Sequence, residues 1–163
     1  MTKSSSFKNL ALGLSLAAFC LNAPAGDQVP FKGTFDPIIV SQTPVDATHV
    51  LIVFDVHILA THLGKAHGSA SAILDLTTFR YVGEGTWAAP SGDALALTFT
   101  GQFVPTDTPG LFDNVETIEI VGGTGRFSGA TGAFVAGGQF DALTQSAPAP
   151  VPFKGTISSP GSL

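Results

Sequence analysis

The segment Ile120-Val-Gly-Gly-Thr-Gly-Arg-Phe-Ser-Gly-Ala-Thr-Gly-Ala-Phe134 decides the fold, because it allows two interpretations. A glycine-rich segment can bind phosphate at the start of a helix, or it can turn the chain between two β-strands. The dinucleotide pattern fails because Ser128 stands where its last glycine belongs. The Walker pattern fails because no Gly-Lys-Ser or Gly-Lys-Thr opens a helix there. The segment is therefore predicted to be a corner between strands.

This corner hypothesis gives structural roles to glycines and to two larger residues. Glycine permits a tight reversal after Val121 and close backbone approach further along the segment. Phe127 is expected to pack under the end of a barrel, and Arg126 to pair with an acidic residue there rather than to bind a substrate. The predicted corner residues are Gly122, Gly123, Gly125, Arg126, Phe127, Gly129 and Gly132.

The rest of the chain has the patterning of β-strands. Between Ala94 and Phe103 apolar residues alternate with small or polar ones, as in a half-buried strand. Pro90-Ser91-Gly92-Asp93 before it has turn chemistry, which predicts a hairpin. The predicted strands are 29–36, 49–60, 69–76, 80–89, 94–103, 114–121, 132–142 and 151–158. Eight strands joined by short turns predict an all-β, antiparallel up-and-down barrel, since closure removes exposed edges.

A short repeat supports closure of this barrel. Val29-Pro-Phe-Lys-Gly-Thr34 recurs as Val151-Pro-Phe-Lys-Gly-Thr156 near the other end of the chain. In a closed barrel the first and last strands are neighbours, so we expect the two copies to form the seam. Phe and Gly of each copy should then share one face, and Lys and Thr the other. The alternative is chance similarity between two strands.

The start of the chain is typical of an export signal. Lys3 and Lys8 precede an uncharged run from Leu10 to Leu21, and Ala23-Pro24-Ala25 is a small-x-small cleavage site. Cys20 follows Phe19, where a lipoprotein signal requires a small residue, so Cys20 is interpreted as part of the signal. We predict a cleaved signal peptide over 1–25, a single barrel domain over 26–163, and a secreted or periplasmic protein without membrane insertion.

Composition excludes several functions for the processed chain. Removing the first 25 of 163 residues leaves 138 residues without cysteine, which excludes disulfides, thiolate metal sites and cysteine nucleophiles. The loss of two lysines changes the formal net charge from −5 to −7. An acidic chain without basic clusters argues against nucleic acid and anionic membranes as partners.

The histidines, His49, His57, His62 and His67, all lie in or just after the second predicted strand. A continuing strand would place His57 and His62 on opposite faces, which weakens a metal site. A reversal at Gly64 could bring His62 and His67 together, but two histidines without a third ligand make a poor site. Structural or solvent-facing histidines are therefore expected, with no metal and no cofactor. His62 is expected to bond backbone within its own turn.

Candidates for chemistry are few. Asp55 and His57 share the mixed face of the second strand, where a carboxylate could orient an imidazole for acid–base work. The opposite, wholly apolar face is the better candidate for the core, so the pair is expected to point outward. Glu84 is a third catalytic candidate. Tyr81 and Trp87 share the other face of that strand and, with Phe99, are candidates to line a small-molecule pocket, although such aromatics are more often core.

The glycine segment, together with the Ala60-Thr-His-Leu-Gly64, Ser91-Gly-Asp93 and Gly155-Thr-Ile157 segments, resembles a known family. It is similar to dirigent proteins and allene oxide cyclases, and most similar to secreted bacterial members without an assigned activity. This resemblance covers most of 29–160 and implies an eight-stranded barrel with an apolar interior, trimeric in many plant members. The polar pocket residues of the plant proteins do not match this chain one by one, so no activity is carried over.

Two functional hypotheses remain open. The first is an exported barrel that binds a small apolar molecule, or serves as an interaction module, without catalysis. The second is a cofactor-free cyclase or isomerase that acts on a hydrophobic substrate through the shape of its pocket. A polar cluster inside an open cavity would favour the enzyme, and a barrel filled by Phe, Leu and Val would favour binding or a structural role.

Overall fold

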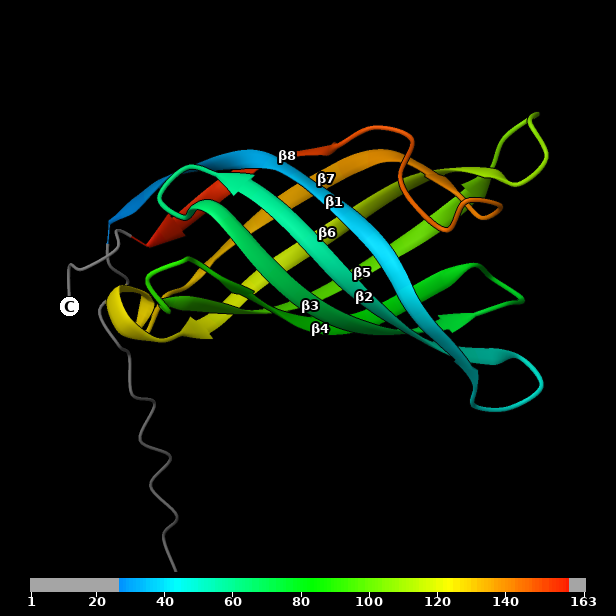
Figure 1. Cartoon of the computed structure of the whole chain (residues 1–163), viewed down its shortest axis with the longest axis horizontal. Helices are drawn as coiled ribbons and strands as arrows, with labels where there is room; N and C mark the ends of the chain where they lie inside the picture. The colour runs from blue at the N-terminus through cyan, green and yellow to red at the C-terminus, as the bar shows by residue number, and fades with distance from the viewer. Residues whose placement is uncertain (1–26, 159–163) are drawn as a thin grey trace, which may run out of the picture.

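The structure is a computed structural model that describes residues 27–158, and these residues form a closed β-barrel (Figure 1). Its eight strands are antiparallel to both neighbours and follow chain order around the barrel, which confirms the predicted fold. The strands are β1 (Gln28–Pro44), β2 (His49–Ala60), β3 (Gly64–Asp75), β4 (Arg80–Ala88), β5 (Ala94–Pro105), β6 (Leu111–Gly123), β7 (Gly132–Asp141) and β8 (Val151–Ser158). The predicted signal peptide over 1–25 lies outside the described residues.

Among the residues that the structure describes, no helix has the length and apolar character needed to span a membrane.

Three strands are clearly longer than predicted: β1, β3 and β6, which spans Leu111–Gly123 instead of 114–121. β1 continues past Asp36 to Pro44, and a bulge between Ile39 and Ser41 shifts its register against β2. β3 begins at Gly64 rather than Ser69, because a short turn after Ala60 lets the chain pair with β2 at once. In both places pairing across strands overrides local residue preference.

The repeated hexapeptide forms the seam of the barrel. β1 pairs with β8 so that Phe31 lies opposite Gly155 and Gly33 lies opposite Phe153. Each phenylalanine is buried beside the glycine of the other copy, and the two rings lie 5.2 Å apart between centroids. Lys32 and Lys154 face each other on the outside. The prediction of seam strands is therefore confirmed.

The glycine segment forms a corner at one end of the barrel, as predicted. A 3₁₀ turn, η1 (Gly125–Phe127), follows β6 and places the Phe127 side chain in the core with 1% exposure. Gly125 has φ of 58° and Gly129 has φ of 69°, values that favour glycine. Arg126 Nε lies 3.4 Å from Asp93 Oδ2 of the β4–β5 turn, so this arginine braces the corner.

The two ends of the barrel are packed differently. At the end that carries η1, called the closed end, fully buried side chains include Phe31, Leu95, Phe127, Phe134 and Ile157. Rings of Phe31, Phe35, Trp87, Phe134 and Phe153 contact one another just inside it. The opposite end, called the mouth, carries the β1–β2, β3–β4, β5–β6 and β7–β8 connections (Figure 1). Side chains therefore fill the closed end of the described barrel densely.

Candidate functional site

Strand β6 supplies two polar residues of the barrel interior, Asn114 and Glu116. Its inward positions are Asn114, Glu116, Ile118 and Ile120, while the alternate side chains are exposed. Glu116 is 8% exposed and is the sole charged residue buried in the described part of the chain. A carboxyl group in an aromatic and aliphatic interior is costly unless it is hydrogen-bonded or protonated.

Tyr81 of β4 supplies that hydrogen bond by reaching over Gly101 of the intervening strand β5. Its hydroxyl oxygen lies 3.2 Å from Glu116 Oε2 and 2.8 Å from Asn114 Oδ1. A phenol has one proton, so it donates to one oxygen at a time. When Glu116 is protonated, the carboxyl can donate to the Tyr81 oxygen while the phenol donates to Asn114. The three side chains thus form a short hydrogen-bonded chain.

Burial changes the acidity of both titrating groups. Removal from water raises the pKa of Glu116 to about 7, and the hydrogen bond from Tyr81 lowers it only in part. Burial first, and the charge of Glu116 second, raise the pKa of Tyr81 above its ordinary value. Glu116 therefore changes protonation near neutral pH, whereas Tyr81 stays protonated.

An inner cavity of about 70 Å³ lies next to these residues. By volume it has room for several water molecules or for a small group of a ligand. Its walls are mostly aromatic and aliphatic, and the polar side chains that line it are Glu116, Asn114, Tyr81 and Gln139. The lining includes Phe35, Ile52, Phe54, Val56, Trp87, Leu97, Phe99, Phe103, Ile118, Phe140 and Val151.

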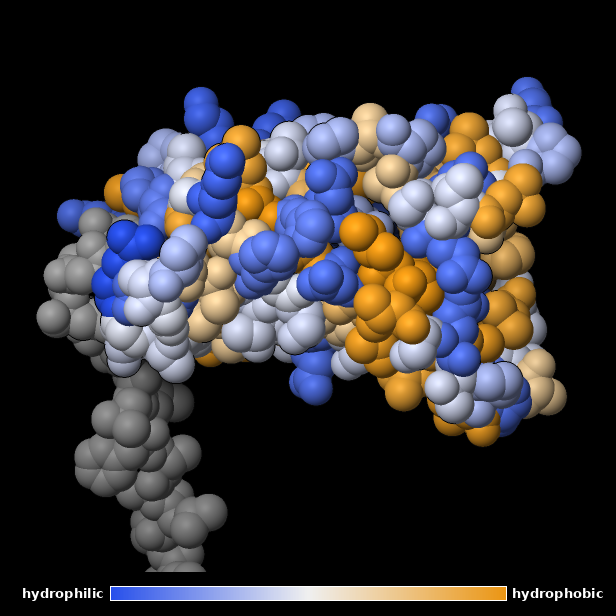
Figure 2. Space-filling model, in the orientation of Figure 1, coloured by the Kyte–Doolittle hydropathy of each residue, from blue (hydrophilic) through white to orange (hydrophobic). Residues whose placement is uncertain are grey.

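A larger cavity of about 330 Å³ lies toward the mouth. It shares Ile52, Phe54, Phe103 and Phe140 with the inner cavity, so the two spaces are adjacent at these four side chains. The Phe103 and Phe140 rings lie 5.4 Å apart between centroids. The rest of its lining is mostly apolar, with two glutamines: Ile39, Gln42, Leu74, Leu76, Phe79, Phe112, Ala142 and Gln145. Figure 2 shows hydrophobic residues gathered toward this end of the molecule.

The structure separates the predicted site residues into two groups. Tyr81, Trp87 and Phe99 all line the inner cavity, where they were expected as candidates for ligand binding. Asp55, His57 and Glu84, the three catalytic candidates, lie on the outer surface. Their strands bury the opposite faces, as the apolar side of β2 predicted. The internal polar cluster is instead made by Glu116, Asn114 and Tyr81.

The histidines are also arranged differently from expectation. His62 Nε2 lies 3.1 Å from the carbonyl oxygen of Pro30, so it bonds backbone of β1 rather than its own turn. The reversal after β2 brings His67 to His57, not to His62, because these two are direct partners across β2 and β3. His49 Nδ1 lies 2.9 Å from Asp46 Oδ2 in the β1–β2 turn.

Glu116 and Asn114 were missed, although the sequence contains a signal for them. Alternation along β6 puts Glu116 in phase with Ile118 and Ile120, which marks a carboxyl on an inward face. The opposite phase, Val115, Thr117, Glu119 and Val121, is equally apolar and also contains a glutamate. Only the register against Tyr81 and the corner glycines decides which face is inside.

No protein family model matches the chain, and no curated protein sequence matches it. Two dirigent proteins are among the solved structures that share its fold. The pterocarpan synthase dirigent protein GePTS1 aligns with a TM-score of 0.54 and 18% identity over 84% of this chain and 88% of that one. The pterocarpan synthase dirigent protein PsPTS1 aligns with a TM-score of 0.55 and 15% identity over 81% of this chain and 95% of that one. The chain therefore has the barrel fold of dirigent proteins.

Proposed function

We propose that the barrel binds a small, largely apolar molecule through its mouth, with one hydrogen-bonding group of the ligand directed toward Glu116. The observation that carries this proposal is the buried polar cluster at the base of an otherwise apolar cavity. Apolar walls with a few placed polar groups are typical of small-molecule sites. The volume of the mouth cavity, about 330 Å³, lies within the range of such sites.

Similarity of fold to dirigent proteins supports the same proposal. The two dirigent proteins that share this fold are pterocarpan synthases. We further propose, from the predicted signal peptide, that the protein is exported and works outside the cytoplasm. We also propose that the processed chain forms a homotrimer. Native mass spectrometry of the exported protein would measure its subunit number.

The binding proposal can be tested with two matched probes, 2-naphthol and naphthalene. Each titration is followed by fluorescence of Trp87, which is the one tryptophan and lines the inner cavity. A hydrogen bond contributes about 0.5–1.5 kcal/mol, so 2-naphthol should bind about 2- to 10-fold more tightly than naphthalene. E116L should abolish that preference. E119Q, on the outer face of the same strand, should retain it.

Equal binding of both probes to the unmutated protein would contradict the assigned ligand orientation. No saturable binding of either probe, together with no ligand in native mass spectra of protein exported by its own host, would contradict binding altogether.

A second candidate function, a cofactor-free isomerase or cyclase, is favoured by the pKa of Glu116 at about 7. A carboxyl group with this pKa can accept and return a proton at neutral pH. A test uses 2-tetralone, an aromatic ketone with acidic α-protons, in D₂O. If Glu116 acts as a base, the protein should speed exchange of those protons for deuterium, and E116Q should lose this effect while E119Q keeps it. Equal exchange with E116Q would leave binding as the function.

A further inference from the structure

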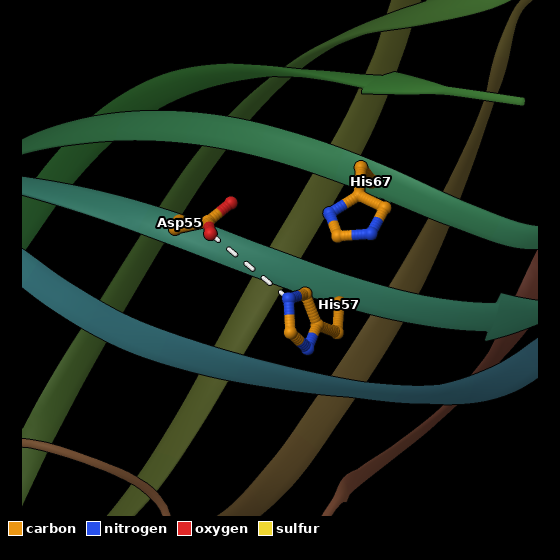
Figure 3. Close-up of side chains that lie close together, drawn as sticks. All are labelled: Asp55, His57 and His67. Atoms are coloured by element: carbon orange, nitrogen blue, oxygen red, sulfur yellow. Dashed lines mark ion pairs between the residues drawn. The ribbon is translucent and has the colours of Figure 1, made fainter.

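We propose that Asp55, His57 and His67 form a Zn²⁺ site on the outer surface of the barrel. The three residues lie on adjacent strands, β2 and β3, and each offers one ligand atom. These atoms all lie within 4.8 Å of one another. Figure 3 shows the three side chains projecting from the same side of the two strands.

Strand register creates this arrangement. Ala60 pairs with Gly64 across the turn, so the antiparallel ladder places His57 directly opposite His67. Their imidazole rings lie 4.6 Å apart between centroids. Asp55 lies two residues before His57 on the same face, and its Oδ2 is 4.0 Å from His57 Nε2. Direct and diagonal neighbours on a sheet face are close enough for side chains to share a ligand.

The geometry requires little adjustment to hold a metal ion. Ligands at about 2.0–2.2 Å from a tetrahedral Zn²⁺ lie about 3.3 Å from each other, so the atoms must approach by about 1.5 Å at most. The side chains of His57 and Asp55 are 52% and 50% exposed, so rotation about their χ angles is not blocked by packing. The remaining coordination position would be open to water.

Local charge and ligand type favour a divalent transition metal. Two imidazoles and one carboxylate suit Zn²⁺, Cu²⁺ or Ni²⁺ and suit Mg²⁺ or Ca²⁺ poorly. Asp36 of β1 faces His57 on the other side and adds a second negative charge near the site. The Asp55–His57 separation of 4.0 Å is at the limit of an ion pair, and the pair is exposed. This contact therefore contributes little stability that would by itself explain why the three residues are clustered.

The test is isothermal titration calorimetry of Zn²⁺ into the untagged full chain, carrying C20S so that no thiolate competes. One ion per chain is expected to bind. H57A and H67A should each weaken binding by at least about tenfold, and D55N should weaken it as well. H49A and H62A are matched controls that should bind as the parent does. Mg²⁺ should not bind at the same concentration.

Proton NMR of the parent protein tests the site without relying on variants, which could fail to fold. On addition of Zn²⁺, the ring proton resonances of His57 and His67 should shift, and those of His49 and His62 should not. The proposal is overturned if Zn²⁺ does not bind the parent, if it binds the H57A/H67A double variant equally well, or if the shifts fall on His49 or His62.

Discussion

Glu116 is the residue on which the interior chemistry depends. It lies among aromatic and aliphatic side chains, yet it accepts or donates a hydrogen bond with Tyr81 and lines the cavity. Burial raises its pKa to about 7, so the folded barrel holds a proton that an unfolded chain would release above about pH 4.5. Protonation of this one group therefore links stability to pH.

The sign of that linkage gives a prediction for E116Q. Because the folded-state pKa is raised, stability from the protonated carboxyl is present below about pH 4.5 and is lost as the pH rises to about 7. The loss is about 3 kcal/mol when complete. Glutamine cannot ionise, so the unfolding free energy of E116Q relative to the parent should increase by that amount between pH 4 and pH 8. Urea unfolding at both pH values measures it, with E119Q as the control that should show no such change.

Y81F tests the hydrogen bonds at the same place. Removing the hydroxyl leaves Glu116 and Asn114 without a partner that they have in the parent, at a cost of about 1–3 kcal/mol. Since the Tyr81 hydrogen bond lowers the pKa of Glu116, its loss should raise that pKa further. Carbon-13 NMR of the Glu116 carboxyl against pH would measure it. An unchanged or lowered pKa would show that Tyr81 does not bond the carboxylate.

At the scale of single residues, the sequence predicts which aromatic side chains lie in the barrel interior but not which carboxyl group is buried there. Alternation correctly places Tyr81, Trp87 and Phe99 in the interior, because their strands have one clearly apolar face. It does not locate Glu116, because both faces of β6 carry apolar residues and a glutamate. It brings His62 rather than His57 toward His67, since pairing follows from a turn length that local pattern does not define.

Individual strands are held by close backbone contact as well as by side-chain packing. The seam between β1 and β8 has glycine opposite phenylalanine in both copies of the repeat. A Cβ at Gly155 would meet the Ala133 carbonyl oxygen and the Phe134 backbone, both on β7. The glycine is thus required because β7 and β8 approach closely at this position.

G155A should accordingly destabilise the barrel by about 1–3 kcal/mol, because the added methyl forces strands apart. G137A is the matched control on β7, where the nearest atom to a new Cβ is the Asn114 carbonyl oxygen at 3.8 Å. Its effect should stay within about 0.5 kcal/mol. Chemical denaturation of both variants measures the difference, and equal stabilities would contradict the close approach.

The outer face of the seam allows a prediction of opposite sign. Lys32 and Lys154 are direct partners, and like charges placed opposite each other are destabilising. K154E should therefore stabilise the protein by about 0.2–1 kcal/mol at low salt. In 1 M NaCl the gain should largely vanish, since the screening length falls to about 3 Å. K65E, opposite uncharged Leu59, should show no comparable gain.

The sequence predicts every strand of the barrel, because alternation and turn residues are local signals. It misses the continuation of β1 past Asp36 and the early start of β3. Both extensions are stabilised by pairing with β2, a partner that is identified only once the chain has folded. The repeated hexapeptide correctly predicts a long-range contact, because its two copies lie on the two strands that pair.

The whole molecule is asymmetric along its length. The closed end is filled by buried side chains and braced by the Arg126–Asp93 pair, whereas the other end contains the cavities. Regions with fewer buried contacts open more readily. The two ends of one continuous barrel should therefore differ in local stability.

Hydrogen exchange should reveal this difference. Amides of Phe31, Leu95 and Ile157 should exchange at least about tenfold more slowly than those of Ile39 and Phe112 near the mouth, which is about 1.4 kcal/mol in opening free energy. A ligand in the mouth should slow the second set more than the first. Equal amide exchange rates along the barrel would contradict a difference in local stability between the closed end and the mouth.

The seam determines at which end of the barrel the molecule would be tethered through its termini. Gln28 pairs with Ser158, so the chain enters and leaves the barrel side by side, next to η1 and away from the mouth (Figure 1). A tether, fused domain or solid support joined through either terminus would hold the barrel by its closed end. The opening would then face outward into the surrounding medium, so immobilised protein should capture ligand as readily as free protein.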